Sequence, residues 1–165
     1  MSMIRGTVHD ITYLFYGQGK KVYLSCVKDS TTREILAYHV SSSLQMDIVY
    51  QTLDKLKERL GDTTHPEALL HSGQGTHYTH PEFQSRVREM GIKQSMSRRG
   101  NCLDNAPMES FFGHMKDELN CKTFQTLDTL QLVIKDYMED YNYNRYQWTL
   151  KKMTPIEYRN HLLSD

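Results

Sequence analysis

The first forty residues contain three consecutive runs rich in β-branched and aromatic side chains, separated by short polar turns. The runs span residues 8–14, 21–27 and 34–40, and the connections are the glycine-containing segment 17–19 and the segment 29–32. Such runs are typical of β-strands, and strands joined by connections this short pair in antiparallel fashion. The sequence therefore predicts a three-stranded antiparallel meander at the start of the chain.

The rest of the chain alternates between helical periodicity and short apolar runs. Apolar residues recur at helical spacing over 44–60, 81–90, 105–119 and 127–141, and strand-like runs lie at 68–70 and 92–96. The segment Thr154-Pro155-Ile156-Glu157 has the form of a capping box and predicts a short final helix. Ser41 to Ser43 are expected to cap the first helix, and Asp104 or Asn105 the third.

This order predicts an α/β fold in which a five-stranded mixed sheet, the meander plus two further strands, is flanked by helices. The 165 residues are sufficient for one domain with its own core, and the C-terminal helices over about 125–165 are expected to pack on it. Three cysteines without a CxxC pair favour free thiols in a bacterial cytoplasm. No apolar run is long enough for a membrane helix.

Charge composition says little about partners, because 20 basic and 20 acidic residues cancel. Any contact with nucleic acid must therefore come from local patches. Carboxylates at strand ends and helix starts are the ligands that Mg²⁺ prefers, so they are candidates for metal-assisted phosphodiester chemistry. Asp10 lies in the first strand, and Glu109 lies near the start of the third helix, on the same side as Lys116.

Several motifs together resemble one family. They are His9-Asp10-Ile11-Thr12-Tyr13, His71-Ser72-Gly73-Gln74-Gly75, the segment 95–101, Asp104-Asn105-Ala106, Glu109-Ser110-Phe111-Phe112 with Lys116, and the segment 143–159. In this order they resemble the integrase core domain of bacterial insertion-sequence transposases, a DDE domain of the retroviral-integrase superfamily. The resemblance covers nearly the whole chain and implies a ribonuclease H-like fold.

The resemblance also implies a catalytic triad of Asp, Asp and Glu, with 35 residues between the second and third members. Glu109 and Asp10 match the third and first members, and 35 residues separate Gly73 from Glu109. The family pattern would read His-Ser-Asp-Gln-Gly, so Gly73 occupies the place of the second aspartate. Because glycine offers no carboxylate, we expect DNA end cleavage and strand transfer to be impaired in this sequence.

By resemblance, an intact site would bind two Mg²⁺ or Mn²⁺ ions, with Asp10 bridging both and Glu109 holding one. Lys116, Arg98 and Arg99 are candidate contacts to double-stranded DNA, at transposon ends and target. A homodimer or higher oligomer on DNA is expected, without a membrane partner. A complete transposase of this kind would carry helix-turn-helix segments upstream, and none precedes Met1.

Other interpretations stay open at this point. Gly73 also fits a catalytically silent module that binds DNA or oligomerises with an active transposase, and the fold class also includes ribonuclease H-like nucleases. Asp104 is a conceivable replacement ligand, although it is more simply a helix cap. A zinc site is one interpretation of four histidines, but ordinary polar histidines are the simpler one: His71, His77, His80 and His114. A base-stacking surface is one interpretation of five aromatic residues, but core or interface packing is the simpler one: Tyr137, Tyr141, Tyr143, Tyr146 and Trp148.

Overall fold

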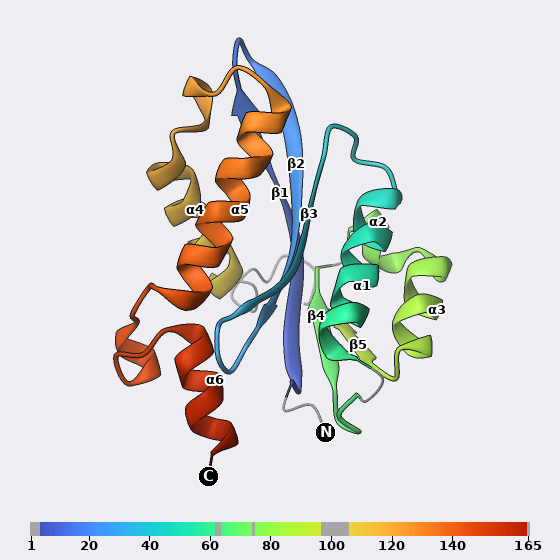
Figure 1. Cartoon of the computed structure of the whole chain (residues 1–165). Helices are drawn as coiled ribbons and strands as arrows, with labels where there is room; N and C mark the ends of the chain where they lie inside the picture. Colours follow the sequence, from blue (N-terminus) through green and yellow to red (C-terminus); the bar gives the residue numbers. More distant parts are fainter. Residues whose placement is uncertain (1–3, 62–63, 74, 97–105, 165) are drawn as a thin grey trace.

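The computed structural model describes residues 4–61, 64–73, 75–96 and 106–164. A single five-stranded sheet runs through the molecule (Figure 1) and has the strand order β3-β2-β1-β4-β5. Its strands are β1 (Gly6–Tyr16), β2 (Lys20–Asp29), β3 (Ile35–Ser41), β4 (Leu69–Ser72) and β5 (Lys93–Met96). The antiparallel pairing of β1 with β2 and β2 with β3, and the parallel pairing of β4 with β1 and β5, confirm the predicted mixed sheet.

Strand β1 extends well beyond its shorter neighbour β4. It pairs with β2 over its whole length, from Thr7 opposite Asp29 to Tyr16 opposite Lys20. Its parallel pairing with β4 covers only Gly6 to Val8. Among the described residues, the part of β1 beyond this pairing therefore has a strand on one side only. This free edge begins where the candidate site lies.

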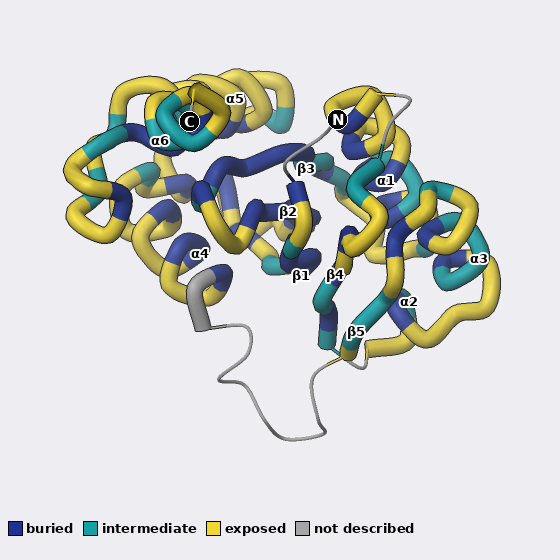
Figure 2. Tube along the Cα trace, turned by 90° about the horizontal axis from the view of Figure 1, so that it is seen from below, coloured by how far each residue is buried: buried dark blue, intermediate teal, exposed yellow. Residues whose placement is uncertain are grey.

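Helices cover both faces of the sheet (Figure 1). Seen along the sheet in Figure 2, helices α1 to α3 lie on one side and α4 to α6 on the other. The bounds are α1 (Asp47–Leu60), α2 (Thr76–Thr79), α3 (Pro81–Glu89), α4 (Ala106–Leu119), α5 (Leu127–Tyr143) and α6 (Pro155–Leu163), with 3-10 turns η2 (Cys121–Thr123) and η3 (Trp148–Leu150). The short helix α2 and the two 3-10 turns were not predicted from the sequence.

Two hydrophobic cores fill the space between sheet and helices. One packs α4 and α5 against the sheet and contains the predicted stripe of α4, with Met108, Phe111, Phe112 and Met115 buried and Leu119 partly buried. The other packs α1 and α3 against the opposite face. Alternation along β1 divides its side chains between the two, since Val8 and Leu14 join the first core and Ile11 packs on the second.

The cap predicted for the first helix is wrong. Ser41 is the last residue of β3, and α1 begins at Asp47 after Met46, which makes no side-chain capping bond. The serines therefore end a strand and open a connection. The capping box of α6 is confirmed, because Thr154 accepts from the Glu157 N–H and the Glu157 side chain accepts from the Thr154 N–H. The predicted cap at Asp104 or Asn105 lies outside the described residues.

A buried ionic network fastens α6 to the meander. The guanidinium of Arg159 donates to Glu34 Oε1 over 2.7 Å and to the Asp29 carboxylate and the Thr32 hydroxyl. Arg59 of α1 forms a second ion pair with Glu34 at 3.0 Å. The network links the C-terminal helices to the β2–β3 connection, which supports the prediction that they pack on the same domain.

Candidate active site

Asp10 lies in β1, two residues past the last register pair with β4, and is half-buried. Alternation puts its side chain on the same face as Val8 and Leu14, toward the core that α4 helps to form. The Ile11 backbone N–H donates to Asp10 Oδ1 over 2.8 Å and so orients the carboxylate. Asp10 is thus held at the start of the free edge of β1.

Glu109 lies in the first turn of α4 and is exposed to solvent. Burial raises the pKa of Asp10; the Ile11 hydrogen bond opposes this, and the negative charge of Glu109 raises the pKa further. The two carboxylates therefore lie within electrostatic range of each other. That they share one metal site stays a prediction.

Gly73 directly follows β4 and is half-buried. The parallel register pairs Val8 with His71, so continuing it by two residues would set Gly73 beside Asp10. The Ser72 hydroxyl donates to the Gly73 carbonyl over 3.1 Å. The extrapolated register therefore predicts backbone atoms, and no side chain, beside Asp10 on this side.

These residues form a limited set of metal donors. Two carboxylates that repel each other are favourable ligands for a divalent cation, since bound positive charge would relieve the repulsion. Within the described ranges, no group of three or more histidine, cysteine, aspartate or glutamate residues is arranged to hold a metal ion. Asp10 and Glu109 are therefore the candidate donors, and no third acid joins them in a metal-holding group in the part of the chain that the structure describes.

Two buried neighbours of Asp10 lie on different faces of the sheet, and sequence reasoning assigned no role to either. His9 packs on Tyr78 and Phe83 on one face, and Cys26 lies in the core on the other, the face of Asp10. His9 is fully buried, and its Nε2 lies 2.7 Å from Ser25 Oγ. Burial lowers the pKa of His9 to about 3, so this imidazole is neutral at ordinary pH. Cys26 pairs with Asp10 across the strands, and burial followed by the charge of Asp10 raises the pKa of its thiol. Of these two groups, only the Cys26 thiol lies on the same face of the sheet as the Asp10 carboxylate.

The predicted basic residues have different outcomes. Lys116 lies on α4 seven residues after Glu109, and its Nζ is 5.0 Å from the centre of the Tyr13 ring on β1. Its side chain therefore reaches the free edge of the strand that carries Asp10. Arg98, Arg99 and the possible replacement ligand Asp104 lie outside the described residues.

The histidines and aromatic residues set aside in the sequence have mixed environments. His71 Nδ1 lies 3.2 Å from Ser95 Oγ, His77 Nε2 lies 2.8 Å from the Leu44 carbonyl oxygen, and the His80 side chain caps α3. Tyr137 and Tyr141 are buried in the core beneath α5, as expected. By contrast, Tyr143, Tyr146 and Trp148 are exposed, so core packing does not explain them.

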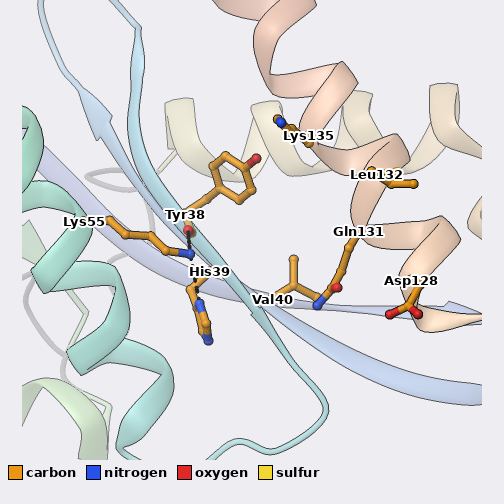
Figure 3. A pocket seen from close by; sticks show the side chains of 8 residues that line it. All are labelled: Tyr38, His39, Val40, Lys55, Asp128, Gln131, Leu132 and Lys135. Carbon is orange, nitrogen blue, oxygen red and sulfur yellow. Dashed lines mark hydrogen bonds between the residues drawn. The ribbon is translucent and has the colours of Figure 1, made fainter.

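A hollow of about 520 Å³ lies away from these residues, between β3, α1 and α5 (Figure 3). Lys55 crosses it and donates to the Tyr38 carbonyl oxygen over 3.1 Å, with Nζ 3.0 Å from His39 Nδ1. Because β3 is the outer strand of the sheet, this lysine occupies a backbone acceptor on an open edge. Lysines at such edges discourage pairing with other strands, so we interpret the hollow as part of edge protection.

The combination of a β3-β2-β1-β4-β5 mixed sheet, helices on both faces and an acidic pair at the centre defines the ribonuclease H-like class. Retroviral integrase cores share this fold. The core of bovine immunodeficiency virus integrase superposes with a TM-score of 0.70 at 16% identity, covering 98% of this chain and 97% of that one. The HTLV-2 integrase catalytic core in complex with magnesium gives 0.69 at 15% identity, covering 93% of each.

Sequence comparison gives the family. Two family models, both described as "Integrase core domain", match residues 4–102 and 109–163, and the chain belongs to this family. A putative transposase of insertion sequence element IS150 from Escherichia coli is 43% identical over 93% of this chain and 53% of its own length. An uncharacterized transposase-like protein of Haemophilus influenzae is 40% identical over 94% of this chain and 70% of its own length.

The chain spans a little over half the length of the first of these relatives and more than two thirds of the second. In the part of the chain that the structure describes, none of the helices is long and apolar enough to cross a membrane. The family and fold predicted from the sequence are confirmed.

Proposed function

We propose that this chain is the catalytic core of a DDE transposase that cleaves DNA at the ends of an insertion sequence and joins them to target DNA. The observation that supports the proposal is the influence of the Glu109 charge on Asp10, which lies at the free edge of β1 just beyond its pairing with β4. The transposase relatives and the integrase cores with the same fold support it.

In this proposal Asp10 and Glu109 hold a divalent ion, Mg²⁺ or Mn²⁺. Such an ion stabilises negative charge on a phosphodiester and favours an oxygen nucleophile, either water or a DNA 3′-hydroxyl. The residues of the chain have supporting roles. The Ile11 N–H fixes the Asp10 carboxylate, and Lys116 contacts a DNA phosphate close to the reacting bond.

Gly73 weakens the site in this proposal. A second ion would lack one of its acidic ligands, so we expect the sequence as it stands to transfer DNA strands poorly. The test is strand transfer of labelled transposon-end DNA by the chain and by Gly73→Asp, with Gly73→Asn as an uncharged variant of the same size. Activity that appears in the aspartate variant alone supports the triad. Equal activity in all three proteins would contradict the assignment of residue 73 to the triad.

A second candidate follows from the same glycine. A core that binds DNA and partner subunits but does not cut would regulate an active transposase by forming mixed assemblies. Titrating this chain into a reaction of an intact relative distinguishes the two proposals. Inhibition that follows co-assembly favours the regulatory role, whereas the absence of co-assembly removes it.

A further inference from the structure

The free edge of β1 carries two exposed aromatic side chains. Tyr13 and Phe15 are 48% and 42% exposed, and their rings meet edge to face with centroids 5.6 Å apart. Both side chains lie on the face opposite to Leu14, beyond the core that α1 and α3 form with the sheet. Aromatic rings usually contribute to cores or interfaces, so two adjacent exposed rings indicate a surface with a partner.

Lysines surround these rings. Lys21 lies on β2 opposite Phe15, and its Nζ is 4.4 Å from the centre of the Tyr13 ring and 5.4 Å from that of Tyr23. Lys116 approaches Tyr13 from α4, at 5.0 Å. The Tyr13 ring therefore has one lysine from its own sheet and another from the helix that carries Glu109.

A groove continues from the rings along the edge of the strand. It encloses about 360 Å³ between β1 and the turn that joins α4 to η2, which is within the usual size range of ligand sites. Its lining consists of Tyr13, Leu14, Phe15, Lys116, Asn120, Cys121 and Lys122. Among these residues there are two lysines and no acid, so the groove favours an anionic occupant with apolar surfaces.

We infer that Tyr13, Phe15, Lys21 and the groove form a binding site for unpaired DNA nucleotides. Flat aromatic rings stack on bases of any sequence, while neighbouring lysines neutralise the phosphates that join them. A double helix hides its base faces, so only a frayed or single-stranded segment presents them. The site begins at Tyr13, three residues after Asp10. Its role in holding a frayed DNA end near the reacting phosphate rests on the proposed function.

Charge argues for DNA over a second copy of the chain. A two-fold dimer through this surface would bring Lys21 and Lys116 of both subunits into one interface, because such interfaces use the same patch of each subunit. Like charges in contact are unfavourable, and the groove lining offers no acid to balance them. A polyanion meets the same lysines favourably.

The test measures binding of a fluorescein-labelled oligothymidylate by anisotropy in EDTA, so that no metal or catalysis is involved. Tyr13→Ala should weaken binding about 5- to 150-fold, the range for losing one stacked base, while Tyr13→Phe keeps the ring and the affinity. Lys21→Gln should lower the salt dependence, with a slope change of about 0.7 for one phosphate contact on a single strand.

The matched control is Trp148→Ala. Trp148 is 81% exposed and has Lys152 Nζ 4.5 Å from its ring, so it also combines an aromatic ring with a lysine, but it lies in η3 after α5. Its loss should leave oligothymidylate affinity unchanged. As the only tryptophan, it should also show no fluorescence quenching when the oligonucleotide binds wild-type protein.

Three outcomes overturn the inference: unchanged affinity in Tyr13→Ala, an equal loss in Trp148→Ala, or an equal loss on blunt duplex DNA. A sedimentation change in Tyr13→Ala at unchanged affinity would assign the rings to self-association instead. Because the assay contains no metal, failure of strand transfer in Gly73→Asp does not alter its result. Conversely, Gly73→Asp could be active in strand transfer while Tyr13→Ala binds oligothymidylate as well as wild type does. That result would remove this inference and leave the proposed function in place.

Discussion

Asp10 and Glu109 are 99 residues apart in the sequence, yet the charge of Glu109 raises the pKa of Asp10. In the absence of a cation, this repulsion opposes folding, and burial of Asp10 adds to it. A protein whose only purpose was stability would gain by replacing one of the two carboxylates. Under the proposed function, a bound divalent cation would offset this repulsion.

The first prediction concerns metal-linked stability. Gly73→Asp adds a third carboxylate beside Asp10, so it should lower the melting temperature in EDTA. With Mn²⁺ at about a hundred times its dissociation constant, the variant's melting temperature should rise by about 5–10 °C above that value. Calorimetric titration should show metal affinity at least about tenfold above wild type. Gly73→Asn should reproduce neither effect, and a similar response in both variants contradicts the ligand role.

A second prediction follows from the raised pKa of Asp10. The folded state takes up a proton more readily than the unfolded chain, so stability falls as pH rises from about 4 through the raised pKa. Asp10→Asn should remove this loss and make the apo protein more stable at neutral pH. Urea unfolding across a pH series measures both curves. If stability depends on pH in the same way in both proteins, folding does not change the pKa of Asp10.

His9, the neighbour of Asp10 in the chain, should have the opposite pH effect. Its pKa falls from 6.5 to about 3 on folding, so the unfolded chain binds the extra proton between these values. Stability should therefore decline as pH falls from 6.5 toward 3, by about 1.4 kcal/mol per pH unit. His9→Gln should flatten this limb in urea unfolding and leave the limb above pH 7 unchanged. An unchanged acid limb would contradict the assignment.

The sequence was sufficient to predict the sheet because periodicity is a local signal. The β-branched and aromatic run at residues 8–14 lies in β1, and the helical spacing near Met108 and Met115 corresponds to side chains that the structure buries. Element ends were less accurate. Ser41 to Ser43 had the composition of a cap, but pairing of Ser41 with Tyr23 continues β3 instead. Tertiary pairing competes with capping, and a single sequence does not display that competition.

The prediction of the acidic pair had a different basis. Resemblance to a family placed Asp10, Gly73 and Glu109, whereas composition and periodicity alone gave only two carboxylates at plausible positions. The environment of Tyr13 was not predictable in the same way. Alternation places the side chains of Tyr13 and Leu14 on opposite faces of the sheet. The approach of Lys116 to the Tyr13 ring, however, depends on where α4 packs. Contacts across 103 residues of chain have no local signature.

The last prediction concerns the buried network beneath α6. Arg159 is 7% exposed and pairs with Asp29 and Glu34, which are 2% and 3% exposed. Arg159→Met keeps most of the volume but leaves buried Asp29 without its cation and Glu34 with Arg59 alone, so it should lower the free energy of unfolding by about 3–5 kcal/mol in urea denaturation. The control is Arg5→Met, because the Arg5–Glu67 pair is largely exposed and should change stability by less than about 1 kcal/mol. Equal effects of the two substitutions would mean that the network adds nothing beyond ordinary surface charge.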